Sequence, residues 1–190
     1  METEARGRVI LLNGPSSSGK SSIGQALLAV LPDPWFHVPV DGINGMRSTR
    51  YTRALDDAGV QEMLRRTRRG YHRAVAALAS TGNDVVMDYL LSEPWRLDDL
   101  LVVLDGYDVT LVDVHCAPEE LARRERSRGD RPHGLAASQT LIYSHRDNDL
   151  VVDTTARTAA DCARAIAGRL DAIGRPKAFE RLRAARARTS

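Results

Sequence analysis

Residues 14–21 read Gly-Pro-Ser-Ser-Ser-Gly-Lys-Ser, and no other stretch constrains the fold of this chain as strongly. The stretch follows an apolar run, Val9 to Leu12, and precedes apolar residues that recur at helical spacing as far as Leu31. Glycines in such a turn let consecutive backbone N–H groups point inward, and the next helix adds the positive end of its dipole. The order strand, glycine-serine loop, helix therefore predicts a loop that cradles phosphate groups.

The lysine of this loop is one of only two in a chain with 27 basic residues, of which the other 25 are arginine. A compact ammonium group suits a phosphate loop, because the planar fork of arginine would change the geometry there. In loops of this pattern the lysine reaches the β- and γ-phosphates, and the next hydroxyl is a ligand of Mg²⁺. We therefore expect a nucleoside triphosphate with Mg²⁺ to be held by Gly14, Pro15, Ser16, Ser17, Ser18, Gly19, Lys20, Ser21 and Ser22.

Length and composition are typical of one globular domain with a substantial core, since the chain has 190 residues, 43% of them hydrophobic and 27% charged. No apolar run approaches the roughly 20 residues that a membrane-spanning helix needs. No signal peptide precedes the phosphate loop. We therefore expect a cytoplasmic protein without a membrane partner.

Short apolar runs alternate with amphipathic segments along the chain. Such alternation specifies a parallel sheet covered by helices on both faces. The expected strands are Arg8–Leu12, Trp35–Val38, Asp84–Met87, Asp108–Val114 and Leu150–Val152. The expected helices lie near Ser21–Leu31, Val60–Ala79, Glu93–Leu104, Pro118–Arg128, Leu135–Ser144 and Thr158–Ile173. We predict an α/β fold, a three-layer α/β/α sandwich around about five parallel strands.

Asp41 is a candidate for chemistry because it follows the second expected strand, and ligands gather beyond the carboxyl ends of such strands. If that strand neighbours the first, the carboxylate faces the transferable phosphate. It would then orient a substrate hydroxyl and accept its proton. Capping of a short helix explains the same residue equally well.

Asp88 closes the apolar run Val85 to Met87, as the acid of a Walker B strand does. Such an acid holds Mg²⁺ directly or through water. A structural or capping aspartate has the same signature. Asp41 and Asp88 thus supply one base and one metal-side acid, and the pattern leaves open which acid has which role.

An arginine-rich segment near residues 124–133 has the composition of a lid. Gly129 interrupts its helical pattern and is expected to act as the hinge. Closure of such a lid excludes water and neutralises the charge on the phosphoryl oxygens. The guanidiniums expected to take part are those of Arg124, on the nucleotide, and of Arg128 and Arg131, in catalysis, although a solvated helix face explains any one of them as well.

Six elements stand in a recognisable order along the chain: Leu11–Ser22, Leu31–Trp35, Val40–Asp41, Asp88, Arg128–Arg131 and Val152–Thr155. The phosphate loop is common to many kinases, whereas Leu-Pro-x-Pro-Trp and Arg-Gly-Asp-Arg are more specific. Together these elements resemble the chloramphenicol phosphotransferase family, over nearly the whole chain up to about Ile173.

The resemblance implies a P-loop kinase fold like that of shikimate and nucleotide kinases. It also implies ATP-dependent phosphorylation of a hydroxyl on an antibiotic, which gives resistance by inactivation. The base proposed for the family matches Asp41, which favours catalysis over capping. Asp88 matches only the first acid of a paired acidic motif, because Tyr89 follows it.

The chain departs from the family after Asp41, where the family's substrate segment is apolar and acidic. Here the segment appears shorter and contains Arg47, Arg50 and Arg53. These arginines favour a more polar or anionic acceptor if they face the site, and they are surface residues otherwise. The expected partner is a small-molecule hydroxyl acceptor that need not be chloramphenicol.

Residues 175–190 form a basic tail beyond the kinase domain expected at residues 1–174. The tail has six basic residues and one acid, and it contains Phe179 as its only aromatic residue. A nucleic-acid contact is one interpretation, but the lack of further aromatics favours a solvated or frayed helix.

Two other functions fit the same motifs. One is a kinase of a biosynthetic or primary metabolite, such as a nucleoside or a sugar acid. The other is a nucleotide-dependent switch or a nucleic-acid-associated NTPase, which is disfavoured because no Asn-Lys-x-Asp guanine-recognition element occurs. The sequence leaves open the acceptor, the choice between ATP and GTP, and the oligomeric state, a homo-oligomer included.

Overall fold

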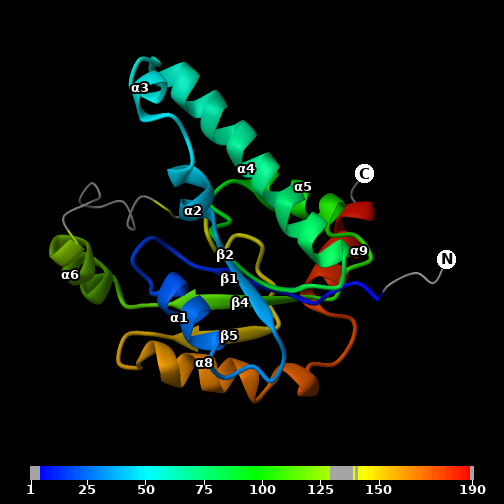
Figure 1. Ribbon diagram of the computed structural model, residues 1–190. Coiled ribbons are helices and arrows are strands. Elements are labelled where there is room, and N and C mark those ends of the chain that lie inside the picture. The colour runs from blue at the N-terminus through cyan, green and yellow to red at the C-terminus, as the bar shows by residue number, and fades with distance from the viewer. Residues whose placement is uncertain (1–4, 129–138, 140, 189–190) are drawn as a thin grey trace.

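A parallel sheet of five strands forms the centre of the protein in the computed structural model, which describes residues 5–128, 139 and 141–188 (Figure 1). The strands follow the order β2-β3-β1-β4-β5 across the sheet. Their bounds are β1 (Val9–Asn13), β2 (Trp35–Pro39), β3 (Asp84–Tyr89), β4 (Val109–His115) and β5 (Leu150–Asp153). All five coincide with the predicted strands to within one or two residues at each end.

Helices cover both faces of the sheet and confirm the predicted three layers (Figure 1). One layer contains α1 (Lys20–Leu27) and α8 (Ala159–Ala167), followed by the 3₁₀ turn η1 (Leu170–Ala172). The opposite layer contains α4 (Asp57–Ser80), α5 (Pro94–Val103) and α9 (Ala178–Ala187). The other helices among the described residues are α2 (Val40–Gly45), directly after β2, then α3 (Thr49–Thr52), and α6 (Pro118–Arg128) after β4.

The core has two parts because side chains of successive strand residues point to opposite faces of the sheet. Leu11 packs with Met87 in the cluster beneath α4, α5 and α9. Leu12 packs with Val86 in the cluster beneath α1 and α8. Burial on both faces explains why these strands are continuously apolar.

The strand order differs from the arrangement considered for Asp41. β3 lies between β2 and β1, so the second strand is not the neighbour of the first. Parallel strands are ordered by non-local pairing, which sequence adjacency does not determine. Because β1 is flanked by β3 and β4, the loop after β1 lies where the chain changes direction across the sheet, the usual ligand site of such folds.

The C-terminal segment corrects the expectation of a solvated or frayed helix. In α9 the side chains of Ala178, Phe179 and Leu182 are buried in the core cluster. Lys177, at the N-cap, places its ammonium 2.5 Å from a carboxylate oxygen of Asp108. The segment therefore packs as a third helix of its layer, and its basic side chains pair with acids of the domain.

Two other helical expectations had different outcomes. The expected helix Leu135–Ser144 lies mostly outside the described residues, and residues 141–145 form turns. Helices α2 and α3 were not predicted, because segments this short carry little periodic signal. Among the described helices, none combines the length and the apolar character needed to cross a membrane.

Candidate active site

The loop between β1 and α1 is curled by two left-handed residues. Ser17 has φ 62° and Gly19 has φ 93°, and a left-handed conformation is unusual for serine. Gly14 cannot carry a side chain, because a Cβ there would lie 2.5 Å from the carbonyl oxygen of Val114. The hydroxyls of Ser17 and Ser18 are buried and have no hydrogen-bond partner within the described part of the chain. Alternating backbone conformations of this kind turn N–H groups toward an anion.

Lys20, the first residue of α1, folds back over the loop. Its Nζ donates to the carbonyl oxygen of Pro15 at 2.8 Å, and the side chain is buried. The ammonium is thus held inside the curl of the loop, where phosphate oxygens would meet both it and the N-terminus of the helix. This geometry fits the β- and γ-phosphates of a nucleotide.

Ser21 and Asp88 form the candidate magnesium position. Ser21 Oγ donates to Asp88 Oδ2 at 2.5 Å, although 67 positions separate the two residues in the chain. Asp88 is buried at the carboxyl end of β3, beside β1. A hydroxyl and one carboxylate fit Mg²⁺, which keeps water and phosphate ligands. No group of three or more metal-ligating acids, histidines or cysteines occurs among the described residues.

Asp41 lies in the first turn of α2, with its side chain exposed to the cleft. The N-cap of this helix is Pro39, so Asp41 does not occupy the capping position that was the alternative to catalysis. Asn44 Nδ2 donates to Asp41 Oδ1 at 3.4 Å. A carboxylate placed in this way can orient an acceptor hydroxyl.

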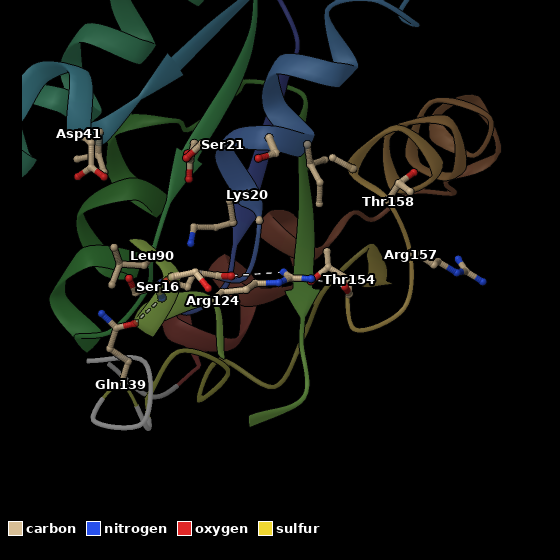
Figure 2. A pocket seen from close by; sticks show the side chains of 18 of the residues that line it. Ser16, Lys20, Ser21, Asp41, Leu90, Arg124, Gln139, Thr154, Arg157 and Thr158 are labelled. Atoms are coloured by element: carbon tan, nitrogen blue, oxygen red, sulfur yellow. Dashed lines mark hydrogen bonds between the residues drawn. The ribbon is translucent and has the colours of Figure 1, made fainter. Parts of the chain in front are cut away.

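A cleft of about 610 Å³ brings these groups together. Figure 2 shows Asp41 and Leu90 toward one end, Arg157 and Thr158 toward the other, and Lys20 and Ser21 between them. The cleft therefore has room for a donor and an acceptor on either side of the phosphate loop.

Arg124 joins α6 to the floor of the cleft. Its Nη2 donates to the carbonyl oxygen of Thr154 at 2.6 Å, and its Nε donates to Glu120 at 2.7 Å. Hydrogen bonds from Arg123 and Arg124 lower the pKa of Glu120 to about 2. Thr154 Oγ1 in turn donates to the carbonyl oxygen of Ser18 at 2.8 Å, which ties the end of β5 to the phosphate loop.

The structure brings most of the predicted site residues into one place. The phosphate loop, Asp41, Asp88 and Arg124 all border the cleft. The side chain of Arg128, with Gly129 and Arg131, lies outside the described residues, so the hinge and those lid arginines stay predictions.

The three arginines after Asp41 are placed differently from one another. Arg47 is half-buried, and its Nη1 donates to Asn44 Oδ1 at 3.0 Å. Arg50 and Arg53 are exposed on and after α3, which projects with the start of α4 away from the sheet (Figure 1). Neither of them lines the cleft described above.

Several cleft residues carry no motif and were not predicted. Arg157 and Thr158 lie in the loop from β5 to α8, and the rule that ligands gather at strand ends could have found them. Gln139 accepts a hydrogen bond from the Ser16 N–H at 2.8 Å and Arg123 lines the cleft from α6, but neither follows a strand end.

The sequence and the fold have known relatives. The family described as "Chloramphenicol phosphotransferase-like protein" matches residues 7–171. A protein from Mycobacterium tuberculosis, provisionally named an O-phosphotransferase, is 31% identical over 198 aligned positions, covering 93% of this chain and 88% of its own.

Solved kinases share the architecture at low identity. The APS kinase of Mycobacterium tuberculosis, solved with AMPPNP and APS, superposes with a TM-score of 0.66 at 18% identity, covering 87% of this chain and 98% of its own. The shikimate kinase of Acinetobacter baumannii, solved with shikimate, superposes with a TM-score of 0.64 at 14% identity, covering 91% of this chain and 97% of its own.

These likenesses agree with the geometry of the phosphate loop and with the predicted three-layer fold. The family match spans most of the chain and includes every strand of the sheet. The chain belongs to the chloramphenicol phosphotransferase-like family, and it is a small-molecule phosphotransferase built on a P-loop kinase fold.

Proposed function

We propose that the protein transfers the γ-phosphoryl group of ATP to a hydroxyl of an antibiotic or a similar small molecule, with Mg²⁺ as cofactor. The observation that carries the proposal is that Asp41 borders the same cleft as the phosphate loop, with Lys20 and Ser21 between it and Thr158. The membership of the family supports phosphoryl transfer, and the named relatives support an oxygen acceptor.

In the proposed reaction the acceptor oxygen forms a bond to the γ-phosphorus while the bond from that phosphorus to the β–γ bridging oxygen breaks. The proton of the hydroxyl passes to a carboxylate oxygen of Asp41 and from there to water. The ammonium group of Lys20 stabilises the negative charge on the phosphate oxygens. The products are the phosphorylated acceptor, ADP and one proton.

Ser21 and Asp88 would hold Mg²⁺, which neutralises phosphate charge when bound. Arg124 is expected to fix the floor of the nucleotide end, because its side chain connects Thr154 to the phosphate loop. At the other end of the cleft, Asn44 orients Asp41 toward the acceptor. The donor and the acceptor thus approach from opposite ends of the cleft.

The test of this assignment is Asp41→Asn, which keeps the shape of the side chain and removes its basicity. We expect kcat for phosphoryl transfer to fall about 100-fold or more, the usual contribution of a general base. The measurement is acceptor-dependent release of ADP, with chloramphenicol and polar hydroxylated antibiotics as acceptors. Affinity for AMPPNP should stay at the wild-type value.

The matched control is Asp57→Asn, which changes an exposed acid in the first turn of α4, outside the described cleft. Wild-type turnover in Asp41→Asn would remove Asp41 from the mechanism. Antibiotic inactivation has its own test, because expression of the wild-type gene, but not of the Asp41→Asn gene, should protect a sensitive bacterium against the compound that is phosphorylated in vitro.

A further inference from the structure

Beyond the Asp41 end of the cleft, three arginines from different elements lie near one another, and two of them, Arg68 and Arg96, lie beside Tyr89. Arg47 follows α2, Arg68 lies on α4 and Arg96 lies on α5; we call these three the arginine cluster. The guanidinium carbon of Arg96 lies 5.8 Å from the centre of the Tyr89 ring. Arg68 interacts electrostatically with both other arginines and with Tyr89.

The arginine cluster has more positive than negative charge. Glu93 is the only carboxylate that hydrogen-bonds to any of its guanidiniums within the described residues, and it bonds to Arg96. The guanidinium of Arg68 makes no hydrogen bond and no close ion pair with another described residue. Burial, and then repulsion from Arg96, lower the pKa of Arg68. Like charges held together in a partly desolvated place favour an anion between them.

Three polar atoms in and beside the cluster lack hydrogen-bond partners among the described residues. The Nε of Arg47, the Nε of Arg96 and the hydroxyl of Tyr89 are all buried, and none has a hydrogen-bond partner among the described residues. Arg96 is only 3% exposed, so water in bulk cannot satisfy it. Buried polar groups are nearly always hydrogen-bonded, and these are donors that match the oxygens of a carboxylate or a phosphate.

Two sets of contacts connect the arginine cluster to the acceptor end of the cleft. Arg47 donates a hydrogen bond to Asn44, and Asn44 donates one to Asp41, so hydrogen bonds connect Arg47 of the cluster to Asp41. Arg96 Nη1 donates to the carbonyl oxygen of Leu90 at 3.1 Å, and Leu90 itself lines the cleft beside Asp41 (Figure 2). These contacts place the arginine cluster next to the acceptor end of the cleft.

We propose that the arginine cluster binds an anionic group, a carboxylate or a phosphate or sulfate ester, of the molecule that Asp41 presents for phosphorylation. The inference rests on the proposed function and narrows the class of acceptor to hydroxylated anions. Of the three arginines expected from the sequence the inference keeps Arg47, and it replaces Arg50 and Arg53, which are exposed, with Arg68 and Arg96. A neutral acceptor would leave the charge of the cluster uncompensated.

The first test compares hydroxylated compounds as free acids and as methyl esters, with shikimate, gluconate and neutral chloramphenicol in the panel, by release of ADP. We expect transfer to acids only. In Arg68→Gln the KM for the best acid should rise about tenfold or more, with kcat much less affected, because a charge-assisted pair is lost. Arg66→Gln, the same change on the same helix with a side chain 73% exposed, should keep the wild-type KM.

Equal kcat/KM for acids and esters, or equal KM values in the two variants, would overturn the inference while leaving the proposed function intact. If no compound is phosphorylated, the proposed function fails in this panel, and the anion site is judged by binding. The probe is then inorganic sulfate, added after Mg-AMPPNP has filled the phosphate loop, at constant ionic strength.

Trp95 reports on this binding because its ring lies 5.9 Å from the guanidinium carbon of Arg96. The chain has two tryptophans, so Trp35→Phe leaves Trp95 as the only fluorophore of this kind. We expect a saturable change of emission in this background and in Arg66→Gln, and its loss in Arg68→Gln. An emission that does not saturate, or that responds equally in all three proteins, would overturn the anion site.

Discussion

At the scale of single residues, His72 shows what burial does to a titratable group. Its side chain is fully buried on α4, and its Nδ1 lies 2.6 Å from Asp99 Oδ2, so the neutral ring donates from Nδ1 to the carboxylate. Its Nε2 is buried without a partner among the described residues, and the centre of its ring lies 5.0 Å from that of Tyr89 in a T-shaped arrangement. Burial lowers the pKa of His72 to about 4, despite the attraction of Asp99.

This shift makes the free energy of unfolding depend on pH in a defined window. The unfolded chain binds a proton at His72 near pH 6.5, whereas the folded chain binds it near pH 4, so acid favours unfolding between these values. We expect protonation of His72 to lower the free energy of unfolding by about 3 kcal/mol between pH 6.5 and pH 4. Urea unfolding across this range should show a shallower slope in His72→Gln. An unchanged slope would contradict the assignment.

The residues that could be predicted from sequence are those whose signal is local. Gly14, Lys20 and Ser21 belong to one continuous motif, Asp41 closely follows β2, and Asp88 lies near the end of β3. Arg68 and Arg96 could not be predicted, because only the packing of α4 against α5 places them around Tyr89.

At the scale of elements, α9 is the part of the chain whose role changed most. A composition dominated by arginine suggested a solvated tail, yet the helix buries Phe179 against the sheet and α5. Its basic side chains reach acids of the domain, with Arg181 at 2.6 Å from Asp147 and Arg186 at 2.9 Å from Asp98. Pairing of this kind leaves these groups engaged within the chain rather than presented to a nucleic acid.

If α9 is part of the core, truncating its one aromatic side chain destabilises the whole domain. We expect Phe179→Ala to lower the free energy of unfolding by about 3–5 kcal/mol, as for a large buried side chain. Arg188→Ala, at an exposed position just after the helix, should stay within about 0.5 kcal/mol of the wild type. Denaturant unfolding compares the two, and equal midpoints would indicate a frayed helix.

The observed helices and strands agree with the predicted ranges wherever the apolar pattern extends over a whole element. The strands and the helices α4, α5 and α6 agree with the predicted ranges, because burial on one or two faces fixes their patterns. The short helices α2 and α3 were not predicted, since segments of six and four residues carry little periodic signal. In the structure Asp41 lies in the first turn of α2 and not at its cap.

At the scale of the whole molecule, the strand order places two groups of cleft residues on opposite sides of the phosphate loop. The order β2-β3-β1-β4-β5 puts Thr154 and Thr158 on the β5 side of the phosphate loop and Asp41 on the β2 side. The fold class was predictable from the alternation of strands and helices, but this order was not, because it is set by non-local pairing. Under the proposed function, the nucleotide and the acceptor then lie on different sides of one cleft.

This separation predicts that nucleotide binding and acceptor chemistry can be removed independently. A ligand at about 100 times its Kd adds about 2.7 kcal/mol to the stability of the folded state. For a chain of this size that corresponds to a rise in Tm of about 5–10 °C. We expect Mg-AMPPNP to produce this rise in the wild type and equally in Asp41→Asn, whose change lies at the acceptor side.

Lys20→Ala should lose most of this rise, because its ammonium is held within the phosphate loop. The measurement is a thermal unfolding series at increasing Mg-AMPPNP, with Asp57→Asn as the variant that leaves both sides unchanged. A wild-type rise in Lys20→Ala would place the nucleotide away from the loop. A diminished rise in Asp41→Asn would show that the two sides are coupled, and Asp41 could then not be read as acting on the acceptor alone.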